Sequence, residues 1–108
     1  MTINEYQKLA HSFAKYGDEL YPVLGLAEEA GEVAGKVAKH LRAKGKLNWD
    51  SDPELTKSIS KELGDVLWMV AEIATVYGLE LEDVMNENIA KLTDRRTRGV
   101  INGSGDNR

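Results

Sequence analysis

Two long segments of the sequence repeat apolar residues every three or four positions, the spacing that gives an α-helix one apolar face. The first stripe contains Val23, Leu26, Ala27, Ala30, Val33, Val37 and Leu41, and the second contains Leu55, Ile59, Leu63, Val66, Val70, Ile73 and Tyr77. The linker between them, roughly Gly45 to Asp52, is short, which favours an antiparallel pairing. Trp49 in this linker would act as a hydrophobic plug or a lid contact. We therefore expect an all-α fold whose core is an antiparallel helical hairpin.

Capping and breaking residues place the ends of four helices. Thr2 and Glu5 form a capping box, and Gly45 is a typical C-terminal stop. These signals predict helices from Thr2 to about Tyr16, from near Glu19–Pro22 to about Lys44, from Asp52–Pro53 to Gly78, and from about Glu80 to Arg98. The prediction is therefore a helical domain over residues 1–98, with flanking helices beside the hairpin, and a flexible tail over residues 99–108.

Composition excludes several classes of protein. A chain of 108 residues suits one compact domain. The absence of cysteine excludes disulfides, thiolate zinc sites and a cysteine nucleophile. A formal net charge of −4 argues against nucleic-acid binding, and no apolar run approaches the ~20 residues of a membrane span. Because its start lacks a signal-peptide pattern, the chain is expected in the cytoplasm.

Carboxylates occupy matching positions on the two long helices. The string EEAGE contains Glu28, Glu29 and Glu32, and the string ELGD contains Glu62 and Asp65. Residues three apart share one face of a helix, and the pairs Glu29/Glu32 and Glu62/Asp65 lie at similar rotational offsets from their apolar stripes. In an antiparallel hairpin these offsets bring both pairs to the same side. Four or five carboxylates are therefore expected to converge there.

Such a cluster of like charges is destabilising unless something compensates it. No lysine or arginine alternates tightly with these acids in the sequence. A divalent cation is the simplest solution, and an all-oxygen ligand set suits Mg²⁺, Mn²⁺ or Ca²⁺ rather than zinc. Either motif alone is more typical of a solvated helix face, but the two at matching offsets indicate a metal site. Because Mg²⁺ commonly binds substrate phosphates, the site points to phosphate chemistry.

Two further features fit a phosphate-bearing substrate. The fourth helix carries a donor-rich strip of Asn88, Lys91, Arg95 and Arg98, which suits phosphate oxygens, although a basic helix end also complements the helix dipole. Trp68 lies nearly opposite the apolar stripe of its own helix. An exposed tryptophan marks a subunit interface or a surface on which a ring stacks, and the interface is the preferred interpretation.

The acidic motifs and their surroundings resemble the MazG-type nucleoside triphosphate pyrophosphohydrolases, an all-α superfamily that also includes dimeric dUTPases. The similarity covers roughly Ile3 to Arg98 and is carried by EYQKLA, YPVLGLAEEAGEVAGKV, ELGDVLWMVAEIA and NENIAKLTDRR. It implies a short, single-domain enzyme that hydrolyses (d)NTP to (d)NMP and pyrophosphate with Mg²⁺, or with Mn²⁺ as its substitute. It also implies a homodimer, often paired into a homotetramer, with a four-helix-bundle-like dimer and sites at the subunit interfaces.

The resemblance also assigns roles to individual positions. The metal would be held by Glu29, Glu32, Glu62 and Asp65. The candidates for the catalytic carboxylate are Glu28, Glu29 and Glu32, with no choice among them as general base. The substrate contacts would be Asn88, Lys91 and Arg95 on the phosphates or sugar, together with Trp68.

Three alternatives stay open at this point. A phosphoribosyl-ATP pyrophosphohydrolase and a dedicated dUTPase or dCTPase share the carboxylates and differ in their contacts with the base. A noncatalytic helical interaction module would carry the same acids as a solvated face and would show no dependence on metal ions. The sequence favours the metal-dependent hydrolase because the acids occur at matching offsets on paired helices.

Overall fold

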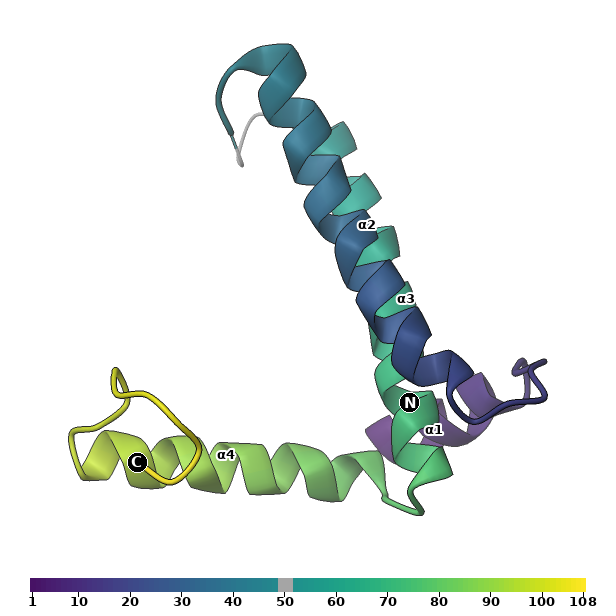
Figure 1. Cartoon of the computed structure of the whole chain (residues 1–108), viewed down its shortest axis with the longest axis vertical. Coiled ribbons are helices and arrows are strands. Elements are labelled where there is room, and N and C mark those ends of the chain that lie inside the picture. The colour runs from purple at the N-terminus through teal and green to yellow at the C-terminus, as the bar shows by residue number, and fades with distance from the viewer. Residues whose placement is uncertain (49–51) are drawn as a thin grey trace.

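The computed structural model describes residues 1–48 and 52–108. In these ranges the chain forms no strand and four helices, α1 (Ile3–His11), α2 (Tyr21–Lys44), α3 (Pro53–Val76) and α4 (Leu81–Thr97). Figure 1 shows α2 and α3 side by side as a long hairpin, α1 across its base, and α4 extending away from that base. The all-α prediction is confirmed, whereas the predicted dimer stays a prediction. Trp49 lies outside the described residues.

Three helix ends follow from local capping. Thr2 and Glu5 exchange hydrogen bonds between side chain and backbone at 2.8 and 3.1 Å, which closes the predicted capping box. The Asp52 carboxylate accepts from the backbone N–H of Leu55 at 2.9 Å and caps α3. Gly45 ends α2 with φ +76°, a left-handed conformation that glycine adopts without steric cost. The end of α2 and the start of α3 are therefore set by residues at those positions.

The first helix is shorter than the sequence pattern indicates. It ends at His11, so the prediction that it continues to about Tyr16 is wrong. The hydroxyl of Ser12 donates to the carbonyl of Leu9, a local bond that competes with helix continuation. The chain then turns, and Tyr16 reaches Glu72 on α3 instead of lying on α1. A tertiary contact thus overrides the helical pattern.

The start of α4 is held by side chains from α1. In the described structure, Glu80 at the N-cap of α4 makes no side-chain capping bond. Gln7 supplies one instead, because its Oε1 accepts from the N–H of Leu81 at 2.7 Å. Its Nε2 donates to the carbonyl of Leu79 at 2.8 Å and to Thr75 Oγ1 at 3.2 Å. One buried amide therefore joins α1, the end of α3 and the first turn of α4.

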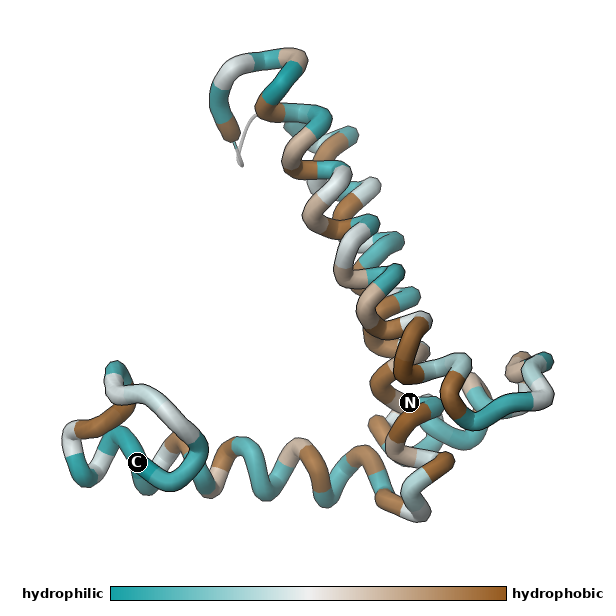
Figure 2. The backbone as a smooth tube through the Cα atoms, viewed as in Figure 1, coloured by the Kyte–Doolittle hydropathy of each residue, from teal (hydrophilic) through white to brown (hydrophobic). Residues whose placement is uncertain are grey.

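Buried apolar packing is concentrated at the base of the hairpin, where Ala71, Ala74 and Leu81 form the core. Further out, stripe residues stay open to solvent, since Leu41 is 41% and Leu63 52% exposed. Apolar positions also recur along α4 (Figure 2). The radius of gyration is 16.9 Å, against about 13 Å for a compact chain of roughly 100 residues. Within the described residues no helix is long and apolar enough to cross a membrane.

Candidate metal centre

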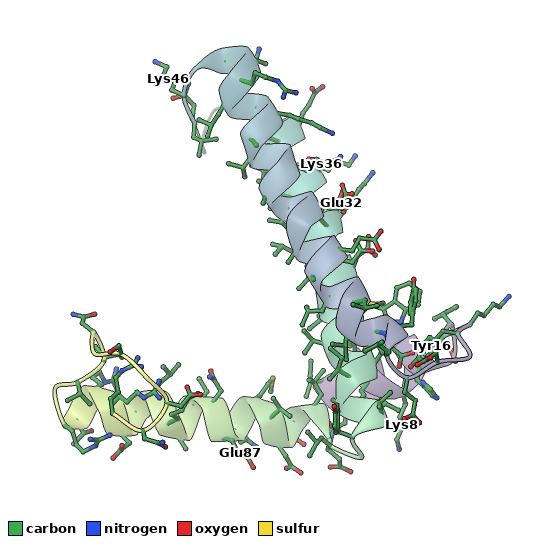
Figure 3. The ribbon with its side chains drawn as sticks, viewed as in Figure 1. Lys8, Tyr16, Glu32, Lys36, Lys46 and Glu87 are labelled. Atoms are coloured by element: carbon green, nitrogen blue, oxygen red, sulfur yellow. The ribbon has the colours of Figure 1, made fainter. Side chains whose placement is uncertain are left out.

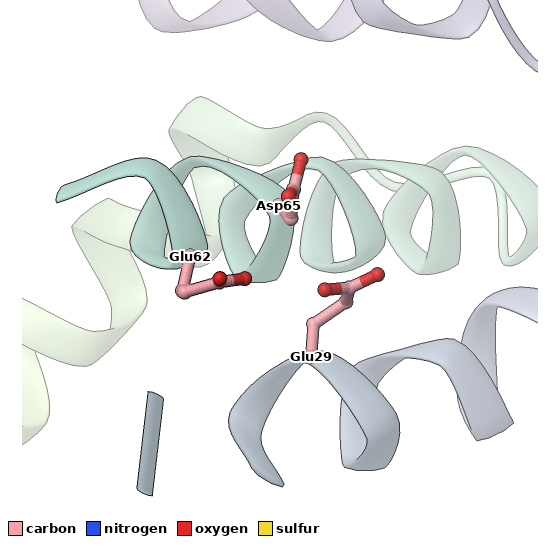
Figure 4. A group of neighbouring side chains, drawn as sticks. All are labelled: Glu29, Glu62 and Asp65. Atoms are coloured by element: carbon pink, nitrogen blue, oxygen red, sulfur yellow. The ribbon is translucent and has the colours of Figure 1, made fainter. Parts of the chain in front are cut away.

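Three carboxylates face one another across the hairpin. Glu29 projects from α2 and Glu62 from α3 into the space between the two helices, and Asp65 lies one turn along α3 from Glu62 (Figure 4). One oxygen from each can be chosen so that all three lie within 4.8 Å of one another. Glu29 and Glu62 are half-buried, and Asp65 is exposed. The structure therefore brings together three of the four predicted metal ligands, and it draws them from both long helices.

The other two acids lie at the margin of this group. Glu28 and Glu32 are exposed, and neither belongs to the set of three converging oxygens. Their charges nevertheless act on it. The pKa of Glu29 is raised above its ordinary value, first by burial and then by repulsion from Asp65, Glu28, Glu62 and Glu32. All five predicted acids thus contribute to one negatively charged region.

The raised pKa of Glu29 predicts how the metal-free protein responds to pH. Because the folded state holds this proton more tightly than the unfolded state, stability falls as pH rises from about 4.5 through the raised pKa. Glu29→Gln removes that loss. Without metal, we expect the variant to melt about 2 °C above the wild type at neutral pH and at the same temperature near pH 4. Thermal melts in EDTA test this, and a variant less stable at neutral pH would contradict it.

A lysine partly neutralises the cluster. Lys36 Nζ lies 3.6 Å from Glu62 Oε1, and Figure 3 shows Lys36 on the same side of the hairpin as Glu32. Lys36 lies outside both acidic strings, so the pattern of those strings does not reveal it. The available signal was the spacing, because Lys36 follows Glu32 by four residues and so lies one turn along the same face.

An apolar pocket of about 310 Å³ opens beside the carboxylates. It is lined by Met1, Tyr6, Leu9, Ala10, Phe13, Gly64, Asp65 and Trp68. The indole Nε1 of Trp68 donates to the carbonyl of Ala10 at 3.2 Å, so the half-buried ring packs against α1 of its own chain. Burial, and then the charge of Asp65, raise the pKa of Tyr6, which keeps its phenol protonated. The pocket therefore combines aromatic walls with one of the three converging carboxylates.

The basic strip of α4 lies apart from these carboxylates within one chain. Helix α4 extends away from the hairpin, and Asn88 and Lys91 are exposed along it. Arg95 is only 5% exposed, because it donates to the carbonyls of Gly105 and Asp106 at 3.4 and 2.9 Å. The tail thus covers Arg95 in the described structure. The predicted phosphate donors and the predicted metal ligands do not meet within one copy.

Comparison with known proteins supplies the family. The family model for the MazG nucleotide pyrophosphohydrolase domain matches residues 19–100. The chain belongs to this family. The matched range of the MazG domain contains α2, α3 and α4 with all five acids, and it leaves α1 outside.

Two relatives of this MazG domain carry names that give no activity. The Gene 37 protein of Mycobacterium phage L5 is 46% identical over 92 residues, which is 82% of this chain and 75% of the relative. YvdC, an uncharacterized protein of Bacillus subtilis (strain 168), is 39% identical over 72 residues, which is 65% of this chain and 68% of the relative. No solved structure matches the chain. A nucleotide pyrophosphohydrolase type of function therefore rests on the family.

The donor set of the MazG domain fits a hard divalent cation. All three converging ligands are carboxylate oxygens, which Mg²⁺ and Mn²⁺ accept, and neither histidine belongs to the group. The repulsion that raises the pKa of Glu29 is the kind of cost that a bound cation relieves. Members of the family generally depend on a divalent metal. The residues present are therefore suited to hold one.

Lys36 is expected to weaken metal binding by the MazG domain, because its charge competes with a cation for Glu62. Lys36→Gln should increase the affinity for Mn²⁺ by about threefold, within the range typical of exposed ion pairs. Isothermal titration with Mn²⁺ measures the change. Lys39→Gln, an exposed lysine on the same helix, is the matched control. Weaker binding by Lys36→Gln would show instead that the lysine helps to organise the site.

Proposed function

We propose that this protein is a Mg²⁺-dependent nucleoside triphosphate pyrophosphohydrolase that converts a (d)NTP to the (d)NMP and pyrophosphate. The observation that carries the proposal is the convergence of Glu29, Glu62 and Asp65 from two helices of a MazG domain. If the acids were only a solvated helix face, their function would not require carboxylates to converge across a hairpin or the pKa of Glu29 to be raised. The noncatalytic alternative therefore accounts for less of the structure. The cytoplasm, where nucleotides are abundant, is the proposed compartment.

The proposal gives the acids distinct tasks. Glu29, Glu62 and Asp65 would hold the cation, which supplies charge neutralisation at the phosphate oxygens and acidifies a coordinated water. Glu28 and Glu32 lie at the margin of the group, where a carboxylate can accept the proton of the attacking water. Glu32 would also serve as a further ligand or orient a water of the ion. The residues at the margin are thus the candidates for general base.

The apolar pocket would take the nucleoside. At about 310 Å³ it lies at the lower end of small-molecule pockets, so it suits a base and sugar better than a whole triphosphate. The rings of Tyr6, Phe13 and Trp68 offer surface for stacking. Because Asp65 lines the same pocket, a nucleoside bound there would direct its phosphates toward the carboxylates.

A second copy would complete the site. Asn88, Lys91 and Arg95 lie on a helix that extends away from the hairpin of its own chain. Exposed apolar side chains, among them Leu67 and Ile89, leave surfaces that another copy would bury. We propose a homodimer with a four-helix-bundle-like core, or a homotetramer built from two dimers, in which the exposed Asn88 and Lys91 of α4 donate to phosphates held by the partner. Arg95 would join them once it releases the tail carbonyls of Gly105 and Asp106. Light scattering tests the assembly, and a stable monomer would contradict it.

The experiment that tests the function is a substrate panel. Pyrophosphate release is measured for each NTP, each dNTP and phosphoribosyl-ATP, with Mg²⁺ and with EDTA. We expect Mg²⁺-dependent release of pyrophosphate with an equimolar amount of the nucleoside monophosphate. Turnover of phosphoribosyl-ATP alone would move the assignment to that branch of the superfamily. No turnover by folded, oligomeric protein would contradict the proposal and support the interaction module.

A further inference from the structure

A carboxylate outside the converging group is buried on α3, two turns beyond the exposed Asp65. Glu72 is 0% exposed and is not part of the converging group. Its two oxygens lie 2.9 and 3.3 Å from His11 Nδ1, and it forms a side-chain hydrogen bond with Tyr16. Burial, the charge of Glu72 and this hydrogen bond raise the pKa of Tyr16, so the phenol stays a donor.

Both partners of this carboxylate belong to other parts of the chain. His11 is the last residue of α1, and Tyr16 lies in the irregular segment between α1 and α2. The ring of Tyr16 also stacks on Tyr21, the first residue of α2, with centroids 5.5 Å apart. A buried carboxylate is costly unless it is paired and hydrogen-bonded. Glu72 therefore joins α1 and the following segment to α3 through bonds whose loss would leave a buried acid without partners.

The attached segment is also a wall of the nucleoside pocket. Ala10, next to His11, accepts the Trp68 hydrogen bond, and Phe13 lines the pocket beside the metal ligands. Phe13 and Trp68 also line a second cavity, of about 130 Å³, which Glu72 lines as well. Two of the residues that would contact a nucleoside thus line both the pocket and the cavity beside the buried carboxylate. The separation of the pocket walls depends on how α1 is held to α3.

We propose that Glu72 is a positioning residue for the nucleotide pocket: by holding His11 and Tyr16 it fixes the α1 wall against α3, and so it sets nucleotide affinity without contacting the nucleotide. The inference rests on the proposed function, because it takes the pocket as the nucleoside site. It requires no contact between Glu72 and the metal. Affinity for nucleotide and affinity for metal should therefore respond differently to changes at this residue.

The test compares Glu72→Gln and His11→Gln with matched controls. Glu72→Gln keeps the size of the side chain and an acceptor for Tyr16 but removes the charge. For both variants we expect KM to rise about tenfold, with kcat within about twofold and Mn²⁺ affinity unchanged. Hydrogen exchange should become about tenfold faster in α1 and residues 12–20, and stay unchanged around Glu29. The controls are Glu54→Gln, an exposed glutamate on the same helix, and His40→Gln near the far end of the hairpin.

Each outcome decides the inference. Unchanged KM and unchanged exchange in folded Glu72→Gln would overturn it, and so would a loss of Mn²⁺ binding, which would place Glu72 in the metal site. If Glu72→Gln does not fold, His11→Gln gives the same answer, because that side chain is 54% exposed and leaves no buried cavity. An inactive wild type would overturn the proposed function. Exchange in α1 would then still show whether Glu72 holds this helix, and unchanged exchange would overturn that as well.

Discussion

Replacing Glu29 with glutamine is expected to lower pyrophosphate release by at least about 100-fold while the helical fold is kept. Glu29 is the α2 member of the converging group, so its charge would be what joins the two helices through a bound cation. Loss of an outer-shell partner of a metal already costs roughly 10- to 100-fold, and a direct ligand should cost no less. Initial rates at saturating Mg²⁺ measure the loss, and circular dichroism checks the fold.

Matched variants separate loss of the metal from loss of the fold. Asp65→Asn should reproduce the effect from α3, whereas Glu54→Gln, which makes the same kind of change at an exposed position, should retain the wild-type rate. Titration with Mn²⁺ should show weaker binding for Glu29→Gln and Asp65→Asn. Wild-type turnover by Glu29→Gln would show that Glu29 is not a ligand of the metal. If Glu28→Gln loses turnover but binds Mn²⁺ normally, Glu28 is the general base.

The carboxylate cluster could be predicted because it depends on two regular properties. The helical period sets the rotation of Glu29, Glu62 and Asp65 about their axes, and the short linker sets the antiparallel pairing. The helical period places Lys36 one turn from Glu32, but it does not predict the ion pair with Glu62. This ion pair depends on the axial register of the hairpin and on the reach of a long side chain, which the helical period does not determine.

The helix ends likewise separate into those set by near neighbours in the sequence and one set by a distant residue. Thr2, Asp52 and Gly45 bound their helices through contacts with close neighbours in the sequence, and their roles were predicted. The end of α1 was not, because Tyr16 leaves the helical path to bond Glu72, which is 56 residues away in the sequence. The subunit interface expected at Trp68 stays a prediction, but the intrachain contact of its indole could not be predicted. Its hydrogen bond to Ala10 depends on where α1 crosses α3, and no local pattern records that crossing.

Among the contacts between residues far apart in the sequence, the capping of α4 by Gln7 has the largest expected consequence. Gln7→Ala should lower the free energy of unfolding by about 2–3 kcal/mol, because three hydrogen bonds contribute ~1 kcal/mol each and the N–H of Leu81 is left buried. The midpoint of thermal unfolding should fall by about 10 °C at matched protein concentration. Lys8→Ala, at an exposed neighbour on α1, is the control and should stay within ~0.5 kcal/mol of wild type.

A graded variant separates the two functions of the Gln7 amide. Gln7→Glu keeps an acceptor for the N–H of Leu81 but loses the donor to Leu79 and Thr75, so its stability should fall between those of Gln7→Ala and the wild type. Equal stability of all three proteins would show that α4 holds its direction without Gln7. If α4 depends on Gln7, the variants should also increase KM, because the first turn of this helix sets where Lys91 can reach. Helix α1, which lies outside the matched family range, would then orient the predicted phosphate donors as well as line the pocket.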